Sequence, residues 1–182
     1  MVKKVAAEIF SSTNPLKILS FLAENPDKEY LGSEIQKATT LSRAGVYIAL
    51  RKLVNQGYVL KTQKGRFHLF RAAYMEPITK QFKILRNIIL LGHVVTRLRS
   101  ISKIIILFGS ASRGEDVSTS DIDLLVISSD PESAKKIISS KKLKRKIQAV
   151  IMTPTKWTEF KGKEAVFSQE VNRGIILWEE RN

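Results

Sequence analysis

Two short groups of residues in the second half of the sequence have the types and spacing suited to phosphate and metal chemistry. Gly109 and Ser110 follow directly after the apolar run Ile104–Phe108, which predicts a buried strand. Glycine at a strand end lets the backbone approach a phosphate closely, and the serine adds a hydroxyl donor beside it. After ten intervening residues, Asp121 and Asp123 open a second apolar run. The spacing predicts a site between two neighbouring strands.

The two aspartates are predicted to be the metal-binding and catalytic residues. Residues two apart on a strand point to the same side, so the carboxylates of Asp121 and Asp123 should lie together. Such a pair suits a hard cation, Mg²⁺ or Mn²⁺, that also binds triphosphate oxygens. Gly109, Ser110 and Arg113 are the predicted nucleotide-binding residues, with Arg113 either contacting phosphate or holding the loop.

This arrangement resembles the signature of the DNA polymerase β nucleotidyltransferase superfamily, and most of all its minimal nucleotidyltransferases. The similarity includes Arg113-Gly114 and the run Ser120–Val126, and it covers about residues 78–180. The resemblance implies an α/β fold with a short mixed sheet and the transfer of a nucleoside monophosphate (NMP) from an NTP to a hydroxyl. It also implies that the Gly-Ser pair holds the triphosphate and that the two aspartates bind the metal.

The resemblance also implies a third carboxylate on a later strand, which helps to activate the attacking hydroxyl. In the run Lys146–Thr153, the corresponding position holds Gln148. An amide neither neutralises a metal nor takes a proton. Three alternatives therefore stay open: an enzyme with a macromolecular acceptor, a catalytically degenerate nucleotide sensor, and a toxin–antitoxin component that modifies a partner.

The first half of the chain has patterns typical of short helices followed by a hairpin. Capping residues and strand-like runs mark these elements. They predict helix starts at Asn14-Pro15, at a Ser33–Gln36 capping box and near Ser42, and strands over Tyr58–Thr62 and Arg66–Phe70. This order resembles winged helix-turn-helix transcription regulators over about residues 10–73, above all in the runs Leu41–Tyr47 and Leu50–Val59.

The charge distribution of this half agrees with double-stranded DNA as a partner. Between Glu34 and Glu76 there is no acidic residue, and phosphates would repel carboxylates at an interface. The alternative is a solvated basic face on a winged helix that binds protein. The residues predicted to contact DNA are Arg43, Tyr47, Arg51, Lys52, Lys64 and Arg66.

Length and composition fit an α+β protein with two domains. We expect an N-terminal winged helix-turn-helix domain at residues 1–75 and a nucleotidyltransferase-like domain at residues 76–182, with residues 76–100 as a connecting helix. The chain has 31 Lys and Arg against 17 Asp and Glu, a formal net charge of +14 that favours polyanionic partners. Cysteine is absent, which excludes disulfides, Cys-ligated zinc and a cysteine nucleophile.

The expected location is the cytoplasm, without a membrane partner, because no apolar run has the length of a signal peptide or of a membrane span. The expected partners are double-stranded DNA, an NTP and an RNA or protein acceptor. The apolar helix over residues 76–100 also suggests a homodimer. The basic run Lys141–Lys146 is predicted either to clamp RNA or a nucleotide, or to be a solvated face.

Overall fold

The computed structural model describes residues 13–140, 143 and 145–180. The chain forms two compact units that divide between Ile89 and Leu90, inside helix α5 (Pro77–Leu98). The boundary predicted at residue 75 lies earlier, because the sequence pattern assigned the whole helix to the second domain. Phe82 packs against the core of the first unit, and Arg86 donates a 2.9 Å hydrogen bond to Glu24. These contacts tie the N-terminal part of α5 to the first unit.

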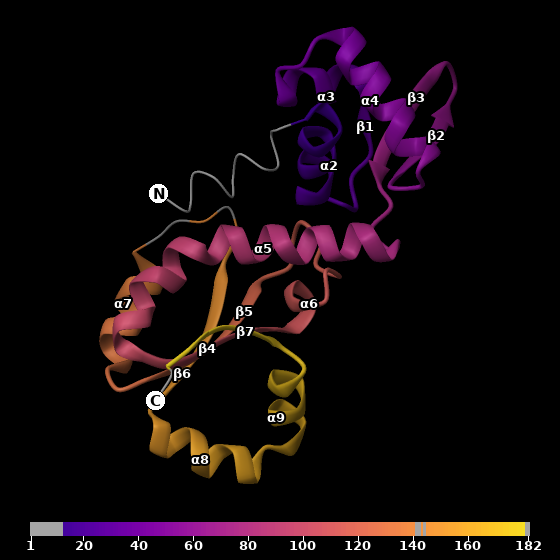
Figure 1. Ribbon diagram of the computed structural model, residues 1–182. Coiled ribbons are helices and arrows are strands. Elements are labelled where there is room, and N and C mark those ends of the chain that lie inside the picture. The colour runs from indigo at the N-terminus through magenta and orange to yellow at the C-terminus, as the bar shows by residue number, and fades with distance from the viewer. Residues whose placement is uncertain (1–12, 141–142, 144, 181–182) are drawn as a thin grey trace. The chain divides into compact units, whose positions relative to one another are not determined.

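Three helices form the first part of the first unit (Figure 1). They are α2 (Asn14–Glu24), α3 (Gly32–Thr39) and α4 (Arg43–Asn55). Ser42 caps α4 as predicted, because its hydroxyl accepts a hydrogen bond from the backbone N–H of Gly45 in the first turn. Thr13, not Asn14, caps α2. The predicted capping box of α3 is wrong by register: the Glu34 carboxylate accepts from the backbone N–H of Leu31 at 2.7 Å.

A three-stranded antiparallel sheet completes this unit. Its strands β1 (Tyr30–Leu31), β2 (Val59–Lys64) and β3 (Phe67–Ala72) lie in the order β1-β3-β2. The β2–β3 hairpin is the expected one, although both strands begin one residue later than predicted. Gly65 and Arg66 form its two-residue turn, and Gly65 has a φ of +59°, which favours glycine. The hairpin thus places Arg66 at its tip.

One apolar face of α4 joins the core of the first unit. Val46, Leu50 and Leu53 are buried there, together with Ile18 of α2 and Ile35 of α3. The spacing of i, i+4 and i+7 in α4 places these side chains on one face of the helix, as the sequence predicts. The other face, which carries the predicted DNA contacts of this helix, is left exposed.

A four-stranded mixed sheet forms the centre of the second unit. The strands are β4 (Ser102–Phe108), β5 (Ile122–Ser128), β6 (Ile147–Met152) and β7 (Ile175–Glu179), in the order β6-β5-β4-β7. β5 and β6 are parallel, and the other neighbours are antiparallel. The predicted short mixed sheet is therefore confirmed, with β7 at an edge.

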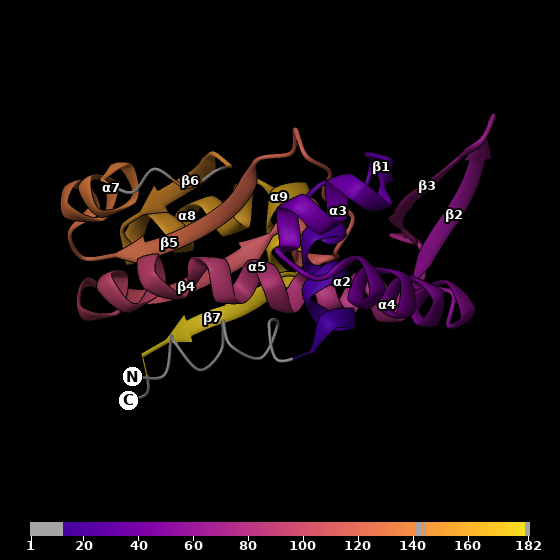
Figure 2. The same ribbon diagram turned by 90° about the horizontal axis from the view of Figure 1, so that it is seen from above.

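Helices cover both faces of this sheet. After the single turn α6 (Gly109–Ser112) come α7 (Pro131–Ser139), α8 (Pro154–Lys163) and α9 (Ala165–Asn172). α8 and α9 lie on one face and α7 on the other (Figures 1 and 2). Phe108, Leu125, Ile127 and Val171 form the core under α8 and α9. Because side chains alternate along a strand, Asp123 shares this face with Leu125.

The connecting helix expected over residues 76–100 is α5, which begins at Pro77 and ends at Leu98. In its second-unit half Leu91, Val94 and Leu98 are buried, whereas Leu90 is 40% exposed. The homodimer expected from its apolar surface stays a prediction. Among the described residues, no helix combines the length and the apolar character that crossing a bilayer requires.

Candidate active site

The backbone places Asp121 and Asp123 at the start of β5. Asp123 is the second residue of the strand, with Phe108 of β4 opposite on one side and Gln148 of β6 on the other. Ile122, between the aspartates, has no exposed surface and anchors the pair in the core. Both aspartates are partly exposed. The buried Ile122 thus fixes the backbone between the two aspartates, while both aspartate side chains keep partial access to solvent.

Gly109 makes room for the carboxylate of Asp123. A Cβ built on Gly109 would lie 2.3 Å from Oδ2 of Asp123, well inside van der Waals contact. Gly109 also has a φ of +69°, a left-handed conformation that side chains disfavour. Glycine is required at this strand end for both reasons, and its backbone lies directly beside a candidate metal ligand.

We expect Gly109→Ala to disrupt the site more than the fold. The methyl group must displace the Asp123 carboxylate, and the left-handed backbone adds a cost of about 1–2 kcal/mol. Isothermal titration of Mn²⁺ with a nonhydrolysable ATP analogue should show an affinity at least about tenfold weaker. Gly162→Ala is the matched control, because a Cβ there meets no atom within 4 Å. Equal affinities of the two variants would contradict this role of Gly109.

The electrostatics of the pair favour a bound cation. Burial raises the pKa of Asp123 above its usual value, and the neighbouring Asp121 raises it further, while Arg145 opposes both effects. In the part of the chain that the structure describes, no group of three or more His, Asp or Glu side chains has the geometry of a metal site. Mg²⁺ is commonly held by one or two carboxylates together with substrate phosphates. The pair therefore fits a cation whose coordination a triphosphate completes.

Gln148 lies beside Asp123 in the parallel β5–β6 ladder. The two residues face the same side of the sheet, and Gln148 is exposed. An amide at this point donates and accepts hydrogen bonds but carries no charge. The site therefore combines the two carboxylates at the start of β5 with an amide in the neighbouring strand, beside Asp123.

Arg113 is held by two carboxylates. Its Nε donates to Glu115 at 3.0 Å, and its Nη1 forms an ion pair with Glu170 of α9. Of its two predicted roles, the structure shows the one of holding the loop after α6; a phosphate contact stays a prediction. Ser110 lies in α6, where its carbonyl accepts from the backbone N–H of Glu115 at 3.0 Å.

Sequence reasoning missed Arg145 and Asp116. Arg145 was part of the predicted basic clamp, of which Lys141, Lys142 and Lys144 lie outside the described residues. Instead of facing solvent, its guanidinium forms an ion pair with the buried Asp116 at 2.6 Å. No local pattern marks this pair, since the two residues are far apart in the chain.

A groove in the first unit gathers part of the predicted DNA-contact residues. Arg43, Tyr47 and Arg51 of α4 line it together with Lys61 and His68 of the hairpin. The remaining predicted contacts, all exposed but outside this groove, are Lys52, Lys64 and Arg66.

Lys64 is not a free cation, because it pairs with Glu29 at 2.7 Å. The hydrogen bonds from Lys64 and then from Thr62 lower the pKa of Glu29. A carboxylate therefore lies beside the hairpin, although the sequence between Glu34 and Glu76 has none.

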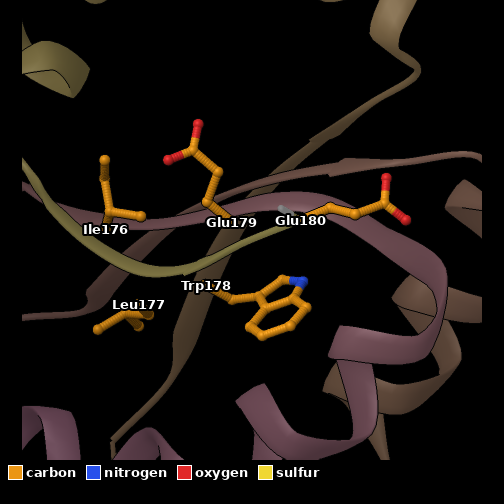
Figure 3. A pocket seen from close by; sticks show the side chains of 5 residues that line it. All are labelled: Ile176, Leu177, Trp178, Glu179 and Glu180. Carbon is orange, nitrogen blue, oxygen red and sulfur yellow. The ribbon is translucent and has the colours of Figure 1, made fainter. Parts of the chain in front are cut away.

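A depression along the edge strand β7 contains none of the predicted site residues (Figure 3). Its lining residues are Ile176, Leu177, Trp178, Glu179 and Glu180. The indole of Trp178 is fixed, since its Nε1 donates to the carbonyl of Ser102 and Arg99 stacks 4.9 Å from the ring centroid. The candidate chemistry is thus located at the β4–β5 end and not here.

Comparison with known proteins agrees with the geometry of the second unit. Residues 91–172 match the family model described as "Nucleotidyltransferase domain". A crystal structure from Sulfolobus solfataricus, named a "putative nucleotidyltransferase", is 16% identical over 56% of this chain and 87% of that chain, with a TM-score of 0.39. No curated protein matches the chain. The family match lies within the second unit and includes Gly109 and both aspartates.

Proposed function

We propose that the second unit transfers NMP from an NTP to a hydroxyl group of an RNA or protein acceptor. The observation that carries this proposal is that the Asp123 carboxylate occupies the space where a Cβ of residue 109 would lie, inside the region that matches the nucleotidyltransferase family. A side-chain-free backbone and the carboxylates of Asp121 and Asp123 therefore belong to one end of the sheet. An NTP with its divalent cation requires that combination.

The chain's own residues position the reacting groups. Gly109 and Ser110 hold the triphosphate, and Asp121 and Asp123 hold Mg²⁺ or Mn²⁺. When bound, the cation neutralises phosphate charge and orients the α-phosphate. The acceptor oxygen attacks the α-phosphorus, the bond from that phosphorus to the bridging oxygen breaks, and pyrophosphate leaves. The hydroxyl proton passes to water, because the Gln148 amide does not accept it.

Incubation of the purified protein with Mg²⁺ and each α-³²P-labelled NTP tests the proposal. The reactions are run alone and with a lysate of the source cells, and label should appear in macromolecules with release of pyrophosphate. Nuclease and protease digestion of the product identifies the acceptor class. Label on one partner protein would favour the toxin–antitoxin alternative. The absence of label, with every NTP and lysate, would contradict transfer.

A nucleotide sensor is the second candidate, and Gln148 is the observation that favours it. Its amide lies in the ladder position next to Asp123, where an acid would complete the carboxylate set. A sensor binds the NTP with its cation and releases no pyrophosphate. Equilibrium binding of the labelled NTP, measured beside pyrophosphate release, separates the two candidates.

For the first unit, we propose a winged helix-turn-helix that binds double-stranded DNA. Support comes from the groove between α4 and the hairpin. Its described lining includes two arginines, a lysine and a histidine, and no carboxylate among the residues that the structure describes. Tyr47, which lines the groove, and Ile48, the next residue of α4, are 67% and 66% accessible. A helix that enters the major groove needs such an exposed face without negative charge.

We expect Arg51→Ala to weaken DNA binding more than Lys64→Ala. Arg51 lines the groove, whereas Lys64 is already neutralised by Glu29. Each lost phosphate contact should reduce the slope of log K against log salt by about 0.9. Fluorescence anisotropy on a duplex at several salt concentrations measures this slope.

Lys156→Ala, which removes an exposed cation of α8 in the second unit, is the matched control for this DNA experiment. It should leave the salt slope unchanged. An unchanged slope in Arg51→Ala as well would indicate a winged helix that binds protein.

A further inference from the structure

The backbone holds the two aspartates of the site in different ways. Asp123 belongs to β5 and is paired on both sides, by Phe108 and by Gln148. Asp121 precedes the strand, whose first ladder bond runs from the N–H of Ile122 to the carbonyl of Lys146 at 2.9 Å. The sheet therefore positions only one of the two carboxylates, and another contact must position Asp121.

Arg145 provides contacts on both sides of Asp121. Its Nε donates to the carbonyl of Ser120 at 2.9 Å, and its Nη2 donates to the carbonyl of Asp121 at 3.1 Å. These carbonyls belong to the peptide units before and after the Asp121 Cα. Because Nε and Nη2 form one rigid edge of the planar guanidinium, both peptide units are held by a single group. These two hydrogen bonds therefore fix the direction of the backbone at Asp121.

Asp116 holds the opposite edge of the guanidinium. Nη1 of Arg145 donates to Oδ2 of Asp116 at 2.6 Å, and the side chains are only 14% and 5% exposed. Two hydrogen bonds between Ser120 and Val117 also hold the loop that joins Asp116 to Asp121. The Ser120 hydroxyl accepts from the N–H of Val117 at 2.9 Å, and the N–H of Ser120 donates to the Val117 carbonyl at 3.0 Å. The guanidinium is thus oriented by a buried acid and is not one of the solvated cations of a basic run.

We propose that Arg145 is a positioning residue of the nucleotidyltransferase site, which sets Asp121 in register with Asp123 by binding the carbonyls of Ser120 and Asp121. The proposal rests on the proposed function, because it assigns the two aspartates to one cation. Its support is geometric: one guanidinium binds the carbonyls on both sides of the Asp121 Cα and is itself fixed by Asp116.

Arg145→Lys tests the fork geometry, because lysine keeps the charge and cannot bind two carbonyls and a carboxylate in one plane. Two measurements are made on the full chain. The affinity for Mn²⁺ in the presence of a nonhydrolysable ATP analogue is followed by electron paramagnetic resonance, and hydrogen exchange is followed at the amides of Val117 and Ser120. We expect an affinity about tenfold or more weaker, as for other residues that orient metal ligands, and faster exchange at both amides.

Lys146→Gln is the matched control, since it removes an adjacent, exposed cation and leaves the backbone bond to Ile122 in place. It should change neither measurement. If Arg145→Lys keeps the Mn²⁺ affinity within twofold of the wild type, the positioning role is overturned. If the wild type itself binds no Mn²⁺ with nucleotide, the proposed function fails. In that case unchanged amide exchange at Val117 and Ser120 in Arg145→Lys would by itself overturn the role of Arg145 in holding this loop.

Asp116→Asn serves where Arg145→Lys fails to fold. It removes the charge that orients the guanidinium and keeps a similar shape. We expect about threefold weaker Mn²⁺ affinity and faster exchange at Val117. Wild-type values in both measurements would contradict the proposal.

Discussion

Replacement of Asp123 by asparagine is expected to reduce NMP transfer by more than about 100-fold, beyond the usual loss for a residue that only orients a metal ligand. The change keeps the side chain's shape against Gly109 and removes its charge. One carboxylate, Asp121, then remains for the cation. Initial rates of label transfer at saturating Mg²⁺, together with the Mn²⁺ affinity, measure the effect.

The same substitution should not destabilise the protein. Burial and the charge of Asp121 raise the pKa of Asp123 in the folded state. A carboxyl with a raised folded-state pKa is unfavourable to folding once pH exceeds its unfolded pKa, so at neutral pH the neutral amide removes an unfavourable charge. The melting temperature of Asp123→Asn is expected to equal or exceed that of the wild type at pH 7. Loss of activity without loss of stability is typical of a functional site.

Asp130→Asn is the matched control for Asp123→Asn. Asp130 caps α7 by accepting from the N–H of Ser133 at 3.0 Å, and asparagine caps helices equally well. Its transfer rate should match the wild type. Transfer that persists in Asp123→Asn at the rate of this control would contradict the assignment of the carboxylate pair.

Local patterns were sufficient to predict the elements that carry the two aspartates. The apolar runs before Gly109 and after Asp121 became β4 and β5. β5 is buried along nearly its whole length and needs no polar alternation, and the apolar residues of β4 are buried or partly buried. Ser42 was predictable as a cap for a similar reason, since capping depends on residues within one turn. In contrast, β1 has only two residues and no detectable period.

The contacts that complete the site could not be predicted in this way. Arg145 binds groups that lie 24 to 29 residues earlier in the chain, and Arg113 pairs with Glu170 across 57 residues. Their partners are fixed by the folding of loops onto strand ends, which leaves no periodic signal. In the sequence, Arg145 is one cation in a run of five, so its burial is invisible before the fold is known.

At position 148 the sequence and the structure bear on the same question. The sequence has Gln148 where the family pattern has a carboxylate, and the sheet places this residue next to Asp123. Gln148 is exposed, and substitution there should not disturb packing. It faces the same side as Asp123 in the adjacent strand. An acid at this position would therefore meet a cation held by the aspartates and a hydroxyl that must lose its proton.

Gln148→Asp is accordingly expected to increase NMP transfer by roughly 100-fold, at the lower end of the factor that general base catalysis supplies. It should also strengthen Mn²⁺ binding. Without a cation, the added charge beside Asp123 is repulsive, so the melting temperature should fall in EDTA and recover with Mn²⁺ and nucleotide. Transfer rates and thermal melts with and without the cation measure both effects.

Gln63→Asp, which adds the same charge at an exposed strand position of the first unit, is the control for Gln148→Asp and should leave transfer unchanged. A wild type that transfers slowly and a faster Gln148→Asp identify an enzyme that works with an incomplete carboxylate set. A wild type without detectable NMP transfer, together with transfer by Gln148→Asp, identifies a nucleotide sensor that lost turnover at this one position. If Gln148→Asp neither transfers NMP nor binds Mn²⁺ more tightly, the third carboxylate does not belong beside Asp123, and the proton must leave the acceptor by another route.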